Sequence, residues 1–259
     1  MIQKEFANHA KKLLMEDQNV IGLAVGGSWL SDELDEFSDL DLILVTKEKI
    51  SDKKSEMLGY ANRIGKLLTG FTGEHVGEPR VLICLYDNPL LHVDIKFLTL
   101  DELATRVEDP HILFDRDNQL LQAFQKSEAM FPYPDYQWIE DRFWIWIHYT
   151  LLKVGRGEYM EAIDFFGFMR MVVLGPLLHI KNGNLLRAVR KVETTLKTED
   201  LNNIKLTLPY YDRQSILAAL KNAIDLYKSL RTELFDHKID LKEETEEKVM
   251  NYLTKIKNA

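Results

Sequence analysis

The sequence predicts an α+β fold in two parts: a mixed sheet with flanking helices over residues 1–130, and an all-α helical bundle over 131–259. Two observations indicate this division. Short apolar runs and alternating apolar and polar residues, which are typical of strands, are confined to the first part. Two prolines in Phe131-Pro132-Tyr133-Pro134 then interrupt regular structure, and apolar residues beyond them recur at helical spacing.

The first part is expected to alternate helices with short strands. A Gly-Ser turn should end the first strand, and helix N-cap residues and glycines mark the later boundaries. The expected elements are a helix at 3–17, a strand at 20–25, a strand around 40–44, a helix from about 51 to 68, a glycine-marked loop over 70–77, strands at 81–86 and 91–97, a helix starting near 101, an apolar stretch at 112–114 and a helix at 118–127.

The second part carries almost no strand signal. Aromatic and aliphatic residues follow helical spacing, so the tryptophan and phenylalanine side chains are interpreted as core. Pro176 is expected to kink or end the helix that contains it, and Asn182-Gly183-Asn184 is expected to form a turn. The expected helices cover 138–154, 158–180, 186–197, 212–235 and 241–257.

Composition excludes several classes of protein. The net charge of −8 and the scattered lysines and arginines argue against a nucleic-acid partner, although an acidic cleft would suit a small cationic acceptor. The start of the chain lacks the apolar core of a signal peptide, and no apolar run reads as a membrane span, so a membrane partner is not expected. Cys84 is the single cysteine and is interpreted as inert packing. We therefore expect a cytoplasmic protein. A homodimer is left open.

A Gly-Ser turn followed by an Asp-x-Asp strand is the most informative feature of the chain. Gly26-Gly27-Ser28-Trp29 precedes Asp39-Leu40-Asp41, with apolar residues on both sides. Because residues two apart on a strand share a face, Asp39 and Asp41 should project together. Two adjacent carboxylates repel each other, and a divalent cation such as Mg²⁺ relieves that repulsion through oxygen ligation. The backbone N–H groups of the turn and the Ser28 hydroxyl could hold a phosphate.

A third carboxylate is expected on a neighbouring strand. In Leu91-His92-Val93-Asp94-Ile95-Lys96-Phe97 the apolar residues alternate with polar ones, which places Asp94 on the polar face. Asp87 and Asp101 are competing candidates, but they lie in turn and helix-start contexts where aspartate usually caps backbone N–H groups.

These residues resemble the motif of the polymerase-beta-like nucleotidyltransferase superfamily over roughly residues 20–98. A looser resemblance covers the second part, where Phe143-Trp144, Lys153 and Arg156-Gly157-Glu158 are similar to the helical domain of the bacterial antibiotic nucleotidyltransferases of the aminoglycoside and lincosamide group. The resemblance implies a nucleotidyltransferase domain at 1–130 and a helical domain at 131–259 that contributes Lys153 to triphosphate binding. Lys153 and Glu158 could equally be helix-end residues that favour the helix dipole.

The resemblance implies an enzyme that transfers a nucleoside monophosphate, expected to be AMP, from ATP or another NTP to a hydroxyl of a small-molecule acceptor and releases pyrophosphate. Antibiotic resistance is the implied role. Asp39, Asp41 and Asp94 would be catalytic and would ligate two Mg²⁺ ions roughly 3.5–4 Å apart. Gly27, Ser28 and Lys153 would bind the nucleotide.

Three alternatives stay open. The protein could modify a partner protein by AMPylation, as antitoxin-like nucleotidyltransferases do. It could be a non-catalytic nucleotide-binding interaction module. It could also be a helical scaffold in which the Asp-x-Asp sequence is accidental. The intact carboxylates argue against the second alternative, and the added helical part argues against the first.

Overall fold

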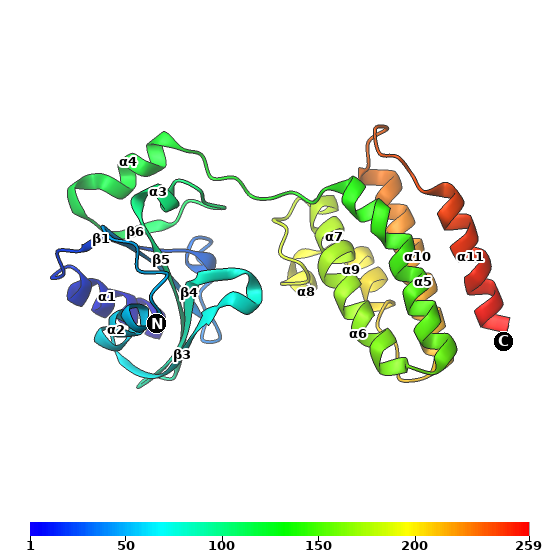
Figure 1. Ribbon diagram of the computed structural model, residues 1–259, viewed down its shortest axis with the longest axis horizontal. Coiled ribbons are helices and arrows are strands. Elements are labelled where there is room, and N and C mark those ends of the chain that lie inside the picture. The colour runs from blue at the N-terminus through cyan, green and yellow to red at the C-terminus, as the bar shows by residue number, and fades with distance from the viewer. Residues whose placement is uncertain (259) are drawn as a thin grey trace. The chain divides into compact units, whose positions relative to one another are not determined.

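The computed structural model describes residues 1–258, and the chain divides into two compact units, Met1–Phe131 and Pro132–Ala259 (Figure 1). The first unit is a six-stranded mixed sheet with flanking helices. Within residues 132–258, the described part of the second unit, all regular structure is helical. The predicted α+β fold class is confirmed.

The sheet of the first unit combines one parallel strand pair with antiparallel neighbours. Its strand order is β3-β4-β5-β2-β1-β6, in which β2 and β5 run parallel and the other neighbours run antiparallel. The strands are β1 (Val20–Val25), β2 (Leu40–Thr46), β3 (Lys66–Gly73), β4 (Glu78–Asp87), β5 (Leu91–Leu98) and β6 (His111–Asp115).

Helices pack on both faces of this sheet. The larger core joins α1 (Ile2–Leu14) and α2 (Lys54–Arg63) to the sheet face that carries Leu40, Leu42 and Leu44, each 1% exposed. A smaller core on the opposite face joins α3 (Leu100–Leu103) and α4 (Gln119–Lys126) to Val45 of β2 and Leu98 of β5. The alternation read from the sequence of β2 is therefore confirmed, since its leucines lie in the larger core.

One predicted helix is too long. Helix α2 ends at Arg63 and strand β3 begins at Lys66, whereas the sequence predicts a helix to about residue 68 and then a loop over 70–77. Gly65 separates the two elements, and a Cβ placed there would lie 2.9 Å from the Tyr86 ring and 3.0 Å from that of Phe6. Antiparallel pairing with β4 decides the conformation of this segment, because backbone hydrogen bonds to a neighbouring strand override a weak local helix preference.

The second unit is built from helices that enclose one apolar core. Phe143 and Trp144 are fully buried, as predicted for core residues, together with Ile147. Trp138 and Phe168 are each 40% exposed, so the prediction that the tryptophan and phenylalanine side chains form core is wrong for these two. The helices are α5 (Tyr136–Arg156), α6 (Tyr159–Met169), a π-helical turn (Arg170–Leu174), α7 (Gly175–Lys181), α8 (Val192–Thr195), α9 (Thr198–Lys205), α10 (Arg213–Leu234) and α11 (Glu243–Asn258).

The segment around Pro176 continues as a helix instead of breaking. Pro176 has no N–H and cannot donate to the preceding turn, and the π-helical turn directly upstream accommodates this loss. Most of the helix predicted at 186–197 is irregular, since Ala188 and Lys191 have positive φ angles of 52° and 59°. The Ala188 carbonyl packs on Gly175, where a Cβ would lie 2.1 Å from its oxygen. This close tertiary contact, which a helix would not make, explains the wrong prediction.

The continuous helical stretch Tyr159–Lys181 has the length and mean hydropathy of a membrane span, contrary to the sequence expectation that no run would qualify. In the structure 44% of its apolar window is buried, and Phe166, Val173 and Leu177 belong to the core of the helical unit. A core helix of a folded bundle has the same composition, so length and hydropathy alone do not assign it to a membrane.

Cys84 lies in β4 and is 2% exposed. Burial raises the pKa of its thiol to about 12, so the reactive thiolate is scarce at neutral pH. The interpretation of Cys84 as a packing residue is consistent with this environment.

Candidate active site

The Gly-Ser turn follows directly from the end of β1. Gly27 begins a short 3-10 turn, Gly27–Trp29, with a φ of +62° that favours glycine. A Cβ at Gly27 would lie 2.0 Å from Oδ2 of Asp41, and the N–H of Gly26 donates to the Asp41 carbonyl oxygen at 3.0 Å. The turn is therefore wrapped closely around Asp41, and only glycine leaves room for the carboxylate at position 27.

Asp41 and Asp94 are brought together by the sheet. Strands β2 and β5 pair in parallel with Asp41 opposite Asp94. Both are partly exposed, whereas their neighbours Leu40, Leu42, Val93 and Ile95 are buried on the opposite face. Side chains of directly paired residues on one sheet face lie within mutual reach. The expectation that Asp94 lies on a strand beside Asp41 is confirmed.

The expectation that Asp39 and Asp41 lie on the same strand is wrong for Asp39, which lies outside β2. It directly precedes Leu40, the first residue of β2, and is partly buried. Its carboxylate is therefore positioned by the loop that enters β2, and not by the ladder that fixes Asp41. Of the two aspartates of the Asp-x-Asp motif, only Asp41 is positioned by the pairing of β2 with β5.

His92 contacts the third carboxylate. Its Nε2 lies 2.9 Å from Oδ1 of Asp94, and the two side chains are 51% and 30% exposed. The ring can hold the Asp94 carboxylate in one orientation, because a histidine bonded to a carboxylate oxygen restricts its rotation. The sequence placed His92 on the same strand face as Asp94, and the contact follows from that spacing.

Glu108 contacts the Gly-Ser turn, although sequence reasoning did not select it. Its Oε1 accepts a hydrogen bond of 3.0 Å from the N–H of Gly27. Glu108 precedes β6, and β6 pairs with β1 so that His111 lies opposite Val25, the last residue of β1. This long-range pairing brings a loop carboxylate to the turn. A Val-Glu-Asp-Pro sequence carries no local signal for that contact.

A second charged network lies further along β4 and β5. Lys96, two residues after Asp94 on the same strand, pairs with Glu78 at 2.8 Å, and Arg80 donates to both oxygens of Glu78 at 2.7 Å. Arg80 first, and then Lys96, hold the pKa of Glu78 down to about 2. Glu78 therefore stays ionised at neutral pH and keeps these two cations in place on the sheet.

The carboxylate pair suits Mg²⁺ in its chemistry. Within residues 1–258 no group of three or more His, Cys, Asp or Glu side chains is arranged to hold a metal ion. Mg²⁺, however, is usually held by one or two carboxylates and completes its octahedral shell with water and substrate phosphate oxygens. Asp41 and Asp94, both oxygen donors and paired in register, fit that mode of binding.

Lys153 lies in the last turn of α5, in the second unit. Its Nζ contacts Glu158 and Glu161 at 2.9 Å each and lies 5.0 Å from the centre of the Tyr149 ring. The hydrogen bond to Glu158, and then that to Glu161, raises the pKa of Lys153, so it is a permanent cation. Glu158 directly precedes α6 and pairs with Lys153, as a helix-end carboxylate can.

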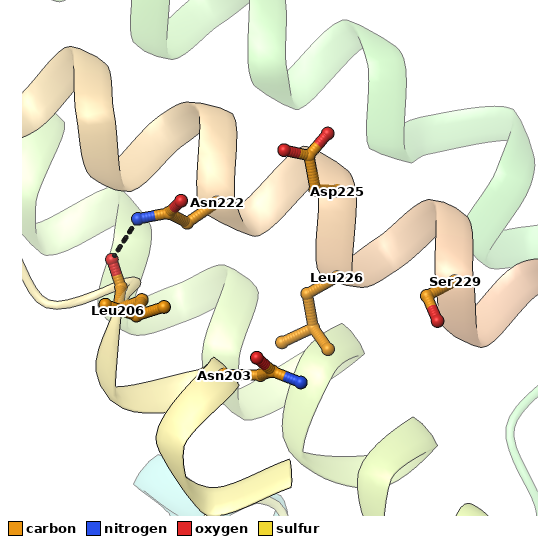
Figure 2. Close-up of a pocket in the computed structure, with 6 residues that line it drawn as sticks. All are labelled: Asn203, Leu206, Asn222, Asp225, Leu226 and Ser229. Atoms are coloured by element: carbon orange, nitrogen blue, oxygen red, sulfur yellow. Dashed lines mark hydrogen bonds between the residues drawn. The ribbon is translucent and has the colours of Figure 1, made fainter. Parts of the chain in front are cut away.

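One open depression occurs between α9 and α10 (Figure 2). It has a volume of about 180 Å³, and its polar groups are occupied in part: Asn222 donates to the Leu206 carbonyl at 3.0 Å, and Asp225 pairs with Lys221. It is lined by Asn203, Leu206, Asn222, Asp225, Leu226 and Ser229. These residues include none of the predicted site residues.

Comparison with known proteins gives structural likenesses alone. No family model matches the chain, and no curated protein matches its sequence. The chain is similar to an aminoglycoside 6-adenyltransferase from Bacillus subtilis, with 16% identity, a TM-score of 0.42 and 99% of each chain covered. It is also similar to a nucleotidyltransferase-like protein from Exiguobacterium sibiricum, with 12% identity, a TM-score of 0.35 and 96% and 89% of the two chains covered. A spectinomycin adenyltransferase from Enterococcus faecialis, solved with ATP and spectinomycin, is 15% identical with a TM-score of 0.32, and 98% of this chain and 99% of that chain are covered.

Proposed function

We propose that this protein is a Mg²⁺-dependent nucleotidyltransferase that transfers a nucleoside monophosphate, AMP in the first instance, to a hydroxyl of a small-molecule acceptor and releases pyrophosphate. The acceptor class proposed is an aminoglycoside-like or lincosamide-like antibiotic. A net charge of −8 favours such a cationic acceptor over a nucleic acid.

One observation carries the proposal: Asp41 lies opposite Asp94 on parallel strands and against the Gly27 turn. The same residues thus combine a carboxylate pair, suited to a divalent cation, with a turn whose backbone can approach phosphate closely. Nucleotidyl transfer needs both features at one place. The Gly-Ser turn followed by Asp-x-Asp in the sequence supports the same reaction.

The reaction proposed here is an in-line displacement at the α-phosphorus. The acceptor oxygen forms the new P–O bond, the bond to the β-phosphate oxygen breaks, and pyrophosphate leaves with the electron pair. Asp94 receives the proton of the acceptor hydroxyl, with its orientation held by His92. The Gly27 turn and Ser28 orient the β- and γ-phosphates.

Mg²⁺, when bound, supplies charge neutralisation for the triphosphate. Asp39, Asp41 and Asp94 are the residues proposed to hold it. The Asp41 carboxylate is already fixed against the Gly27 turn, so its position does not depend on the nucleotide.

The proposal is tested by measuring pyrophosphate release from each of the four NTPs with MgCl₂, in the presence of aminoglycosides, lincosamides or candidate protein acceptors. We expect release that depends on a small-molecule acceptor and stops with EDTA. Mass spectrometry should find the acceptor heavier by one nucleoside monophosphate. Labelling of a protein acceptor alone would favour AMPylation, and NTP binding without pyrophosphate release in any condition would favour a non-catalytic module.

Lys153 remains a predicted ligand of the triphosphate. If it has this role, Lys153→Ala should weaken NTP binding roughly tenfold to a hundredfold, the range for losing one charge-assisted hydrogen bond. Arg156→Ala is the matched control, since Arg156 lies on the same helix, is 67% exposed and contacts Glu158 at 3.9 Å. Calorimetric titration with ATP measures both variants. Wild-type affinity in Lys153→Ala would limit Lys153 to its pairing with Glu158 and Glu161.

A further inference from the structure

One N–H group of the turn that we propose binds phosphate is already bonded to a side chain. Gly27 donates its N–H to Oε1 of Glu108 at 3.0 Å. Glu108 also lies against the preceding glycine, where a Cβ would be 3.2 Å from the same oxygen. A carboxylate oxygen therefore occupies the position that a phosphate oxygen would take on this turn.

The backbone on both sides of Glu108 is anchored. Arg106, whose side chain is 8% exposed, donates to the Ser127 hydroxyl at 2.6 Å and to its carbonyl at 2.7 Å. His111 is held in β6 by its pairing with Val25. Release of Gly27 therefore requires rotation of the Glu108 side chain, and the loop itself can stay in place.

The carboxylates at the turn should repel a metal-free polyphosphate more strongly than a polyphosphate that carries Mg²⁺. The carboxylate of Asp41 lies where a Cβ of residue 27 would be, and the carboxylate of Glu108 accepts the Gly27 N–H. A metal-free polyphosphate would have to displace one carboxylate and then lie beside another, and like charges at such distances repel. A polyphosphate that carries Mg²⁺ brings the cation that offsets these carboxylates.

We propose that Glu108 is a selectivity residue of the nucleotide site. Its carboxylate keeps its hydrogen bond to the Gly27 N–H in the presence of metal-free polyphosphates, and a metal-chelated nucleoside triphosphate displaces it. This inference rests on the proposed function, because it concerns the same turn. It assigns a role to Glu108, namely selection of metal-chelated over metal-free polyphosphate, which the pair Asp41 and Asp94 alone does not provide. Glu108 thereby limits occupation of the site by inorganic polyphosphate.

The test follows the Gly27 amide by NMR in ¹⁵N-labelled protein without any acceptor. Wild type, Glu108→Gln and Glu108→Ala are titrated with metal-free tripolyphosphate in EDTA and, separately, with Mg-ATP. We expect both variants to bind tripolyphosphate at least about tenfold more tightly than wild type, with Mg-ATP affinity changed by less than about threefold. Asp109→Asn is the matched control, because it removes one negative charge from the residue next to Glu108. Asp109 itself pairs with Arg106 at 2.5 Å.

The inference would be overturned if the ratio of the tripolyphosphate and Mg-ATP affinities were the same in wild type and in both Glu108 variants. It would also be overturned if the Glu108 variants lost more Mg-ATP binding than tripolyphosphate binding. The same shift in Asp109→Asn would reduce the effect to net charge and would also overturn it. A dispersed amide spectrum shows for each variant that the first unit is folded. Because the readout needs no acceptor and no turnover, this inference and the transfer reaction can fail independently.

Discussion

Asp41→Asn and Asp94→Asn should each lower kcat for nucleotidyl transfer by about two to three orders of magnitude, the usual effect of removing one electrostatic group from an active site. The reason is their pairing in register on β2 and β5, which places both carboxylates at one point of the sheet. The melting temperature without metal should be unchanged or slightly higher, because one of two repelling charges is lost. Steady-state pyrophosphate release and thermal unfolding measure the two effects.

Two other aspartates of the first unit provide controls. Asp87 pairs with Lys66 at 2.6 Å at the end of β4, and Asp101 lies in the first turn of α3. Asp87→Asn and Asp101→Asn should keep kcat within about twofold of wild type. Full activity in Asp41→Asn would contradict the proposed site. Loss of turnover in Asp101→Asn together with full activity in Asp94→Asn would show that the third carboxylate was misassigned.

Glu140→Ala should lower the free energy of unfolding of the helical unit by about 3–5 kcal/mol, the range for removing one partner of a buried ion pair. Glu140 is fully buried. It accepts from the indole N–H of Trp144 at 3.3 Å, from Arg231 at 3.2 Å and from the backbone N–H of Lys242 at 3.0 Å, and the Tyr227 hydroxyl also donates to it. Its loss leaves these buried donors without their acceptor.

Urea unfolding followed by tryptophan fluorescence measures this effect, because three of the four tryptophans lie in the second unit. Glu140→Gln, which keeps an acceptor and removes the charge, should lose less than Glu140→Ala. Asp225→Asn is the control, since its pair with Lys221 on α10 has both side chains about half exposed and should contribute at most about 0.5 kcal/mol. Equal loss in Glu140→Ala and Asp225→Asn would rule out the buried network as a main source of stability.

Local patterns predicted the elements that depend on neighbouring residues in the sequence. The alternation around Leu40, Leu42 and Leu44 identified β2 and its buried face, and the same logic placed Asp94 on the polar face of β5. The long helix α5 and the turn at Gly183 were also predictable from helical spacing and glycine. Such features follow from the two periods of side-chain direction, which are local properties of the chain.

Local patterns failed where a distant segment decided the conformation. The residues of β3 have a weak helical pattern, and their pairing with β4 makes them a strand. The stretch before α8 has helix-forming residues, but the packing of the Ala188 carbonyl on Gly175 holds it irregular. Both errors concern contacts between segments whose proximity no window of sequence reports.

By itself, the sequence determined the α+β fold class, the glycine turn and the chemical character of Asp39, Asp41 and Asp94. The tertiary structure alone decided that Asp41 lies opposite Asp94, and that Glu108 bonds to Gly27. The physical reason is that side-chain direction is set residue by residue, whereas strand register and the approach of a loop to a turn are set by hydrogen bonds between segments far apart in the chain.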